Sequence, residues 1–88
     1  MRQQHDNARD RDLIERYIDD SPYGKGDARL RNYGVHVWAI IGQLRAANND
    51  LDEVARDYRL PREAIEAALA YYQQNREHVD ARLLLNSA

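Results

Sequence analysis

The chain has 88 residues, 13 of them Lys or Arg and 15 Asp or Glu, which gives a formal net charge of −2 at pH 7. This length allows one small domain, and the charge balance provides no overall basic field for nucleic acid or membranes. The chain contains no cysteine, which excludes disulfides, thiol catalysis and cysteine-based zinc sites. We expect a cytoplasmic protein without a signal peptide or transmembrane helix, because no apolar run has the required length.

The N-terminal third predicts a tail followed by a β-ribbon. Residues 1–12 are almost wholly polar, which predicts a disordered tail in front of a single domain over residues 13–88. Apolar residues alternate in Leu13–Asp20, which fits a short strand and also fits one helical turn. Ser21–Asp27 has the composition of a loop, and Ala28–Val37 that of a second strand. Two strands alone are marginally stable, so the ribbon must pack on helices or on another chain.

Trp38–Ala47 has the apolar spacing of a helix, and the stretch Leu51–Tyr72 predicts a helix, a tight turn and another helix. Pro61 ends the pattern of the first of these two and suits the start of the next. Ala55 is the small residue that a helix-turn-helix needs where its helices cross. Arg59 replaces the usual glycine of the turn, so we expect a turn other than the standard three-residue one. An ordinary αα-hairpin without a nucleic-acid role uses the same core residues and stays an alternative.

The C-terminal segment is unusually apolar for a chain end, and its pattern predicts that the last helix is long. Successive residues on a helix point about 100° apart, so the chain's own core can cover only about half of the large side chains near this end. We expect the rest to form an interface with a partner or with a second copy in a homodimer, although the tail could also fold back over Trp38 and the ribbon. The candidate interface residues are Tyr71, Val79, Leu83, Leu84 and Leu85.

Tyr71 and Tyr72 are adjacent, so they cannot both fill one core; one is expected either at an interface or half-exposed at the edge of the core. The expected fold class is mainly α. It is a three-helix helix-turn-helix bundle with a short N-terminal β-ribbon and a long C-terminal helix.

Charge is distributed unevenly along the chain. Gly24–Ala47 carries a net charge of +3, from four cations and one acid, whereas Asn48–Leu69 carries −3, from three arginines and six acids. Since phosphate neutralisation supplies most non-specific DNA affinity, the ribbon contributes most of the candidate contacts. The candidate DNA-binding residues are Lys25, Arg29, Arg31, Arg59 and Arg62. For the last two, the alternative of solvated helix-end residues paired with neighbouring acids is favoured over contact with DNA. The start of the last predicted helix would offer to a DNA groove Pro61, Arg62, Glu63, Glu66 and Ala67.

Three histidines, at positions 5, 36 and 78, have no ligand spacing, and no glycine-rich phosphate loop is present. We therefore expect no enzyme activity, no metal site and no cofactor.

Three segments resemble the bacterial family called "domain of unknown function 433": GVHVWAII at Gly34–Ile41, EVARDYRLPREAIEAALAYY at Glu53–Tyr72 and REHVD at Arg76–Asp80. The resemblance implies a compact helix-turn-helix fold with a short N-terminal ribbon. Some members resemble VapB-like antitoxins, which are encoded beside a PIN-type ribonuclease toxin. The resemblance thus implies a small antitoxin-like protein that binds DNA at its own promoter and pairs with such a toxin. A protein–protein interaction module that uses the helix-turn-helix only as a scaffold is the alternative.

Overall fold

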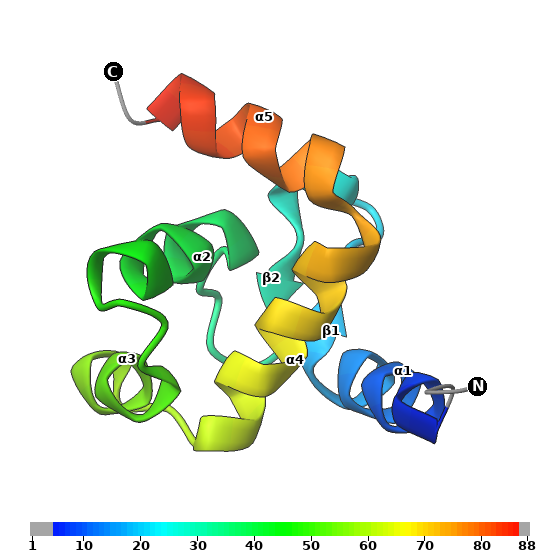
Figure 1. The fold of residues 1–88 in the computed structure, drawn as a ribbon. Coiled ribbons are helices and arrows are strands. Elements are labelled where there is room, and N and C mark those ends of the chain that lie inside the picture. The colour runs from blue at the N-terminus through cyan, green and yellow to red at the C-terminus, as the bar shows by residue number, and fades with distance from the viewer. Residues whose placement is uncertain (1–4, 87–88) are drawn as a thin grey trace.

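The computed structural model describes residues 5–86, in which five α-helices pack around a two-stranded antiparallel ribbon (Figure 1). In chain order the elements are α1 (His5–Tyr17), β1 (Ile18–Asp19), the short 3₁₀ turn η1 (Lys25–Asp27), β2 (Arg29–Leu30), α2 (Val37–Ala46), α3 (Leu51–Tyr58), α4 (Arg62–Gln74) and α5 (Arg76–Asn86). The mainly helical class and the N-terminal ribbon are as predicted.

The helix α4 lies at the centre of the fold. Figure 1 shows it crossing the middle of the molecule, with α1 on one side and α2 and α3 on the other. Its buried residues are Ala64, Ile65, Ala67, Ala68, Ala70, Tyr71 and Tyr72, which together cover more than half of the helix circumference. Neighbouring elements therefore enclose α4 on several sides, while Arg62 and Gln73 on the remaining side are exposed. Tyr71 and Tyr72 are therefore both buried, at 3% and 7% exposure, and the expectation that one of them would be left at an interface or half-exposed is wrong.

The helix-turn-helix is present as α3, a turn and α4. The Asp50 carboxylate accepts a hydrogen bond from the Glu53 backbone N–H at 3.1 Å and so caps α3. Three residues, 59–61, separate the helices, and Arg59 takes the left-handed conformation, with φ 60° and ψ 47°. The Leu60 N–H donates to the Ala55 carbonyl at 2.9 Å, as in a Schellman motif. The prediction of a non-standard turn is wrong, because an arginine adopts the conformation that glycine usually supplies.

The N-terminal segment differs from the prediction. Residues 5–12 belong to α1 instead of a disordered tail; residues 1–4 lie outside the described part of the chain. Leu13 and Tyr17 are four residues apart, and this helical spacing, not the alternation expected of a strand, places both toward the core. The ribbon is shorter than predicted and pairs Ile18 with Leu30 and Asp19 with Arg29.

The C-terminal part is two helices, so the prediction of one long helix is wrong. The backbone of Asn75 breaks the helix, with φ −139° and ψ 39°, and its side-chain amide donates to the Tyr71 carbonyl at 3.0 Å. After this break α5 turns back over η1 and α2. Two glycines leave room for it: a Cβ on Gly26 would lie 3.0 Å from the His78 carbonyl oxygen, and one on Gly42 would lie 3.2 Å from Leu83 Cδ2.

Candidate nucleic-acid interface

The exposed cations of the helix-turn-helix lie at its turn. The side chain of Arg59 is exposed at the end of α3, and Arg62 opens α4. The Arg62 guanidinium forms ion pairs with Asp52 at 2.8 Å and with Glu66 at 3.0 Å. Hydrogen bonds to these two carboxylates, that to Asp52 first, raise the pKa of Arg62 above its usual range. Of the two candidates Arg59 and Arg62, Arg62 is therefore paired with neighbouring acids, which is the alternative that the sequence left open.

The face of α4 that was expected to enter a DNA groove lies partly against α1, whereas Pro61, Arg62 and Glu63 remain exposed. Arg9 donates to Glu66 at 2.8 Å, and the Tyr17 hydroxyl donates to Glu63 at 3.1 Å. The hydrogen bond from Arg9, followed by that from Arg62, lowers the pKa of Glu66. Ala67, which the sequence placed at the groove, is completely buried. That part of the prediction is wrong, because α1 was not foreseen.

The ribbon cations have separate local roles. Lys25 is exposed on η1, and the Arg29 guanidinium lies 4.0 Å from the centre of the Tyr23 ring. Arg31 donates to the Asp19 carboxylate at 2.9 Å and to the backbone carbonyls of Glu15 at 2.7 Å and of Ile18 at 3.0 Å. A cation that binds the last carbonyls of a helix is a C-terminal cap. Arg31 therefore fixes the end of α1, a role that the sequence did not reveal.

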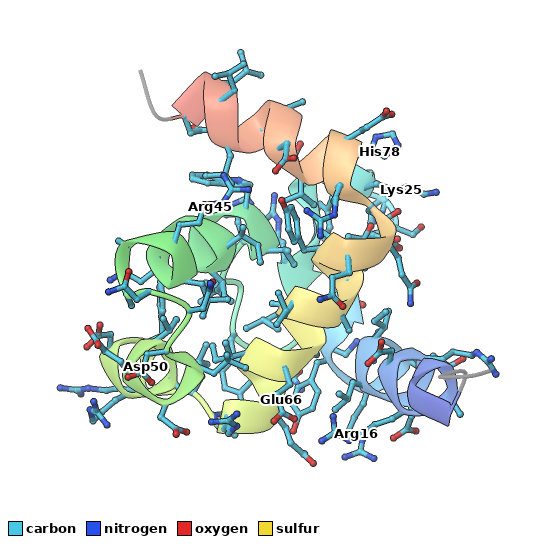
Figure 2. All side chains as sticks on the ribbon, in the orientation of Figure 1. Arg16, Lys25, Arg45, Asp50, Glu66 and His78 are labelled. Atoms are coloured by element: carbon cyan, nitrogen blue, oxygen red, sulfur yellow. The ribbon has the colours of Figure 1, made fainter. Side chains whose placement is uncertain are left out.

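The five candidate DNA contacts do not converge on one surface. Lys25 lines a groove of about 350 Å³ with the α4–α5 junction, including Gln74 and His78. Figure 2 shows Lys25 beside His78, far from Glu66 near the start of α4. Because α4 rises about 1.5 Å per residue, its two ends are about 18 Å apart. The helix-turn-helix cations and the exposed ribbon cation thus form two separate groups.

The core covers about half of the large apolar side chains near the C-terminus, as the helical spacing predicted, and leaves the others exposed. Val79 is completely buried and Leu83 is partly buried against the core, whereas Leu84 and Leu85 are 75% and 70% exposed. Tyr71 is not available to a partner, since it is buried and its hydroxyl donates to the Asp20 carboxylate at 2.9 Å. Burial and the bond to Asp20 raise the pKa of Tyr71 well above its usual range.

A groove of about 400 Å³ lies between α2 and α5, next to the exposed leucines. At its edge the Arg45 guanidinium donates to the Tyr72 hydroxyl at 2.7 Å and to the Asp80 carboxylate at 3.0 Å, and the same hydroxyl donates to Asp80 at 2.9 Å. Figure 2 shows Arg45 between the two helices. This network connects α2, α4 and α5. Sequence reasoning missed it because its members are far apart in the chain and carry no local motif.

Within residues 5–86 no group of three or more His, Cys, Asp or Glu side chains is arranged to hold a metal ion. No helix in this part of the chain is both long and apolar enough to cross a lipid bilayer.

Comparison with known proteins gives one match. Residues 20–72 match the family described as "Protein of unknown function (DUF433)", a region that runs from the end of the ribbon's first strand to the last turn of α4 and leaves α1 and α5 outside. No curated protein and no solved structure matches the chain significantly. Because the family match covers more than half of the 88 residues, this chain belongs to the DUF433 family.

Proposed function

We propose that this protein is a small antitoxin-like DNA-binding autoregulator that pairs with a PIN-type toxin protein. The observation that carries the proposal is the helix-turn-helix itself: a capped α3, a three-residue turn with an exposed Arg59, and α4. Helix-turn-helix proteins place the second helix in the major groove, while nearby cations contact phosphates. The resemblance to antitoxin-like family members supplies the expected partners, the protein's own promoter and the toxin.

The arrangement of the two candidate surfaces supports this division of roles. The turn that carries Arg59 and the tip of α5 that carries Leu85 belong to different helices, and Figure 1 shows α5 and α3 at opposite ends of the molecule. Leu85 is 70% exposed although it is large and apolar. One end of the molecule could therefore contact DNA while the other binds a protein or a second copy in a homodimer.

The test is binding of the full chain to the DNA upstream of its own gene, measured by fluorescence anisotropy at several salt concentrations. Arg59→Asn removes the cation and retains a side chain that tolerates the left-handed conformation. It should weaken binding and reduce the slope of log K against log salt by about 1, as expected for one phosphate contact. Binding to the promoter no tighter than to a scrambled duplex would refute autoregulation.

A protein–protein interaction module without DNA binding is the second candidate. It is favoured by the burial of Ala67, by the two acids that hold Arg62, and by the net charge of −3 over residues 48–69. The two candidates differ in one measurement. The interaction module should bind the product of a neighbouring toxin gene, with or without Arg59→Asn, and should show no preference for the promoter.

A further inference from the structure

We propose that α1 is an intramolecular cover over the DNA-reading face of α4, and that the protein reads DNA only when α1 leaves this face. This inference rests on the DNA binding proposed above and adds the regulation of the same surface. It is derived from three features of the structure: the position of α1, its size relative to a DNA groove, and the nature of the contacts that hold it.

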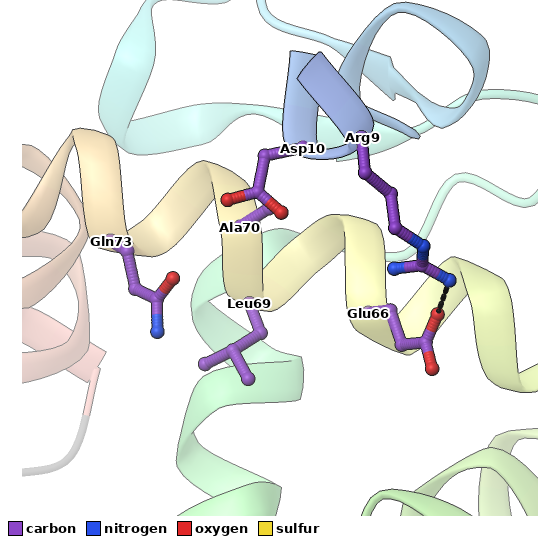
Figure 3. A pocket seen from close by; sticks show the side chains of 6 residues that line it. All are labelled: Arg9, Asp10, Glu66, Leu69, Ala70 and Gln73. Atoms are coloured by element: carbon purple, nitrogen blue, oxygen red, sulfur yellow. Dashed lines mark hydrogen bonds and ion pairs between the residues drawn. The ribbon is translucent and has the colours of Figure 1, made fainter. Parts of the chain in front are cut away.

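The position of α1 coincides with the residues that a groove would meet. Glu63, Glu66, Ala67 and Ala70 recur at helical spacing on one side of α4. Glu63 and Glu66 accept hydrogen bonds from α1, while Ala67 and Ala70 are 0% and 3% exposed. Figure 3 shows Arg9 above this side of α4, bound to Glu66 across a groove that Ala70 also lines. Part of the same chain therefore already occupies the side of this face that carries Glu66, Ala67 and Ala70, whereas the side chains of Arg62 and Glu63 at its start are 50% and 49% exposed.

Two packed helices do not fit into one groove. The major groove of B-DNA is about 12 Å wide, and a single α-helix with its side chains is already about 10–12 Å across. Packed helices have axes about 8–10 Å apart, so α1 and α4 together are far wider than the groove. DNA and α1 must therefore compete for the reading face.

The contacts of α1 are of a kind that can open. Leu13 is its one buried large apolar side chain in the described part of the helix, and Ile14 and Tyr17 are only partly buried. The side chains of Arg9 and Arg16, which reach Glu66 and Glu63, are 56% and 53% exposed. Exposed ion pairs are individually weak and are screened by salt. A helix of 13 residues is also marginal by itself, so α1 can unfold once it detaches.

The C-terminal end of α1 is built as a tether. Arg31 binds the Ile18 carbonyl and the Asp19 carboxylate, and both residues belong to the ribbon strand that follows α1. Release of the last turn of α1 also requires Arg31 to give up the Glu15 and Arg16 carbonyls, while its bonds to Ile18 and Asp19 can keep the strand in place. Once uncovered, Glu63 and Glu66 are acceptors that suit the amino group of cytosine in the major groove. The family match starts at residue 20, so the cover lies outside the matched region.

Variants that remove positive charge from α1 give a test in which two explanations predict opposite changes in DNA affinity. Arg9→Gln combined with Arg16→Gln loosens the cover but removes two positive charges. If α1 only supplied positive charge near DNA, this variant would bind its promoter more weakly. If α1 is a cover, binding should tighten about two- to thirtyfold, since two exposed ion pairs hold the closed state and apparent affinity follows the open fraction.

Two controls connect the change in affinity to α1. Arg11→Gln removes one positive charge from an exposed position on the same helix, and Arg11 is not among the arginines that contact α4 in the described structure. It should not tighten binding. Hydrogen exchange of the amides in residues 9–17 should accelerate in the double variant and not in Arg11→Gln.

A covalent lock tests the closed state directly, because the chain contains no native cysteine. Asp10 and Gln73 line the same groove between α1 and α4, away from the Arg9–Glu66 contact (Figure 3). Asp10→Cys and Gln73→Cys, joined by a cleavable bismaleimide, should lose promoter binding and recover it after cleavage. Equal binding before and after cleavage, or weaker binding by the loosened double variant, would overturn the cover while leaving DNA binding intact. Absence of promoter binding in every form, with faster exchange of α1 in the double variant, would instead refute the proposed function and the inference with it.

Discussion

Replacing Ala55 by leucine should destabilise the domain strongly, because this alanine lies where α3 and α4 meet. Its side chain belongs to the buried core, at 7% exposure, and its carbonyl accepts the Leu60 N–H that closes the turn. The isobutyl group of leucine has no space there and must push the helices apart or force strained side chains. Overpacking of this kind costs about 1–3 kcal/mol. For a domain of this size the melting temperature should fall by about 4–24 °C.

The assay is thermal unfolding followed by circular dichroism. Ala46→Leu provides the matched control, since Ala46 is an exposed alanine at the end of α2 and receives the same side chain. Exposed substitutions change stability by about 0.5 kcal/mol or less. If Ala55→Leu melted within the range of this control, Ala55 would not be at the crossing of the two helices, and the helix-turn-helix packing described here would be wrong.

Three further predictions follow from single residues. Arg59→Gly should raise the free energy of unfolding by about 1 kcal/mol, because glycine adopts the left-handed conformation freely, whereas Arg56→Gly within α3 should lower it by a similar amount. If denaturant unfolding showed changes of the same sign for both variants, the strain assigned to Arg59 in the turn would be contradicted. Leu85→Arg should convert a dimer into a monomer in sedimentation without changing the melting temperature. The proposed interface would have no basis if the parent protein were monomeric at high micromolar concentration and did not bind a neighbouring toxin. The hydrogen bond from Arg9 is the main cause of the lowered pKa of Glu66, so the stabilising contribution of Glu66 is present above about pH 4.3 and is lost as the pH falls through the lowered pKa. Stability should therefore decrease more between pH 5 and pH 3 in the parent than in Glu66→Gln. Equal pH profiles of stability would show that this contact contributes nothing.

The helix-turn-helix was predictable because its signals are local. Asp50 caps α3 through a backbone N–H only three residues ahead, and Pro61 stands directly before α4. The apolar spacing around Ala55 is likewise contained within two helical turns. A single window of sequence holds all of this information. The position of the ribbon and the exposure of about half of the C-terminal apolar residues followed from equally local arguments.

The helix α1 could not be found in the same way. Its first residues are polar, and the partners that order it are distant: Arg9 and Glu66 are 57 positions apart. Polar composition predicts disorder only when no partner surface is known. Arg31 shows the same limit, because nothing near it in the sequence indicates that it caps the end of α1. Of the candidate DNA contacts, Arg59 is exposed at the turn as its sequence position suggests.

Local patterns of capping, proline and apolar spacing were thus sufficient for the type and approximate limits of α2, α3 and the start of α4. Long-range packing decided the rest. It buried both Tyr71 and Tyr72 by packing neighbouring elements on several sides of α4, and it ended α4 at Asn75 so that α5 could turn back over α2. It also placed α1 on the side of α4 that carries Glu63 and Glu66. The physical reason is that propensity and periodicity act over one or two helical turns, whereas burial depends on which distant surfaces meet.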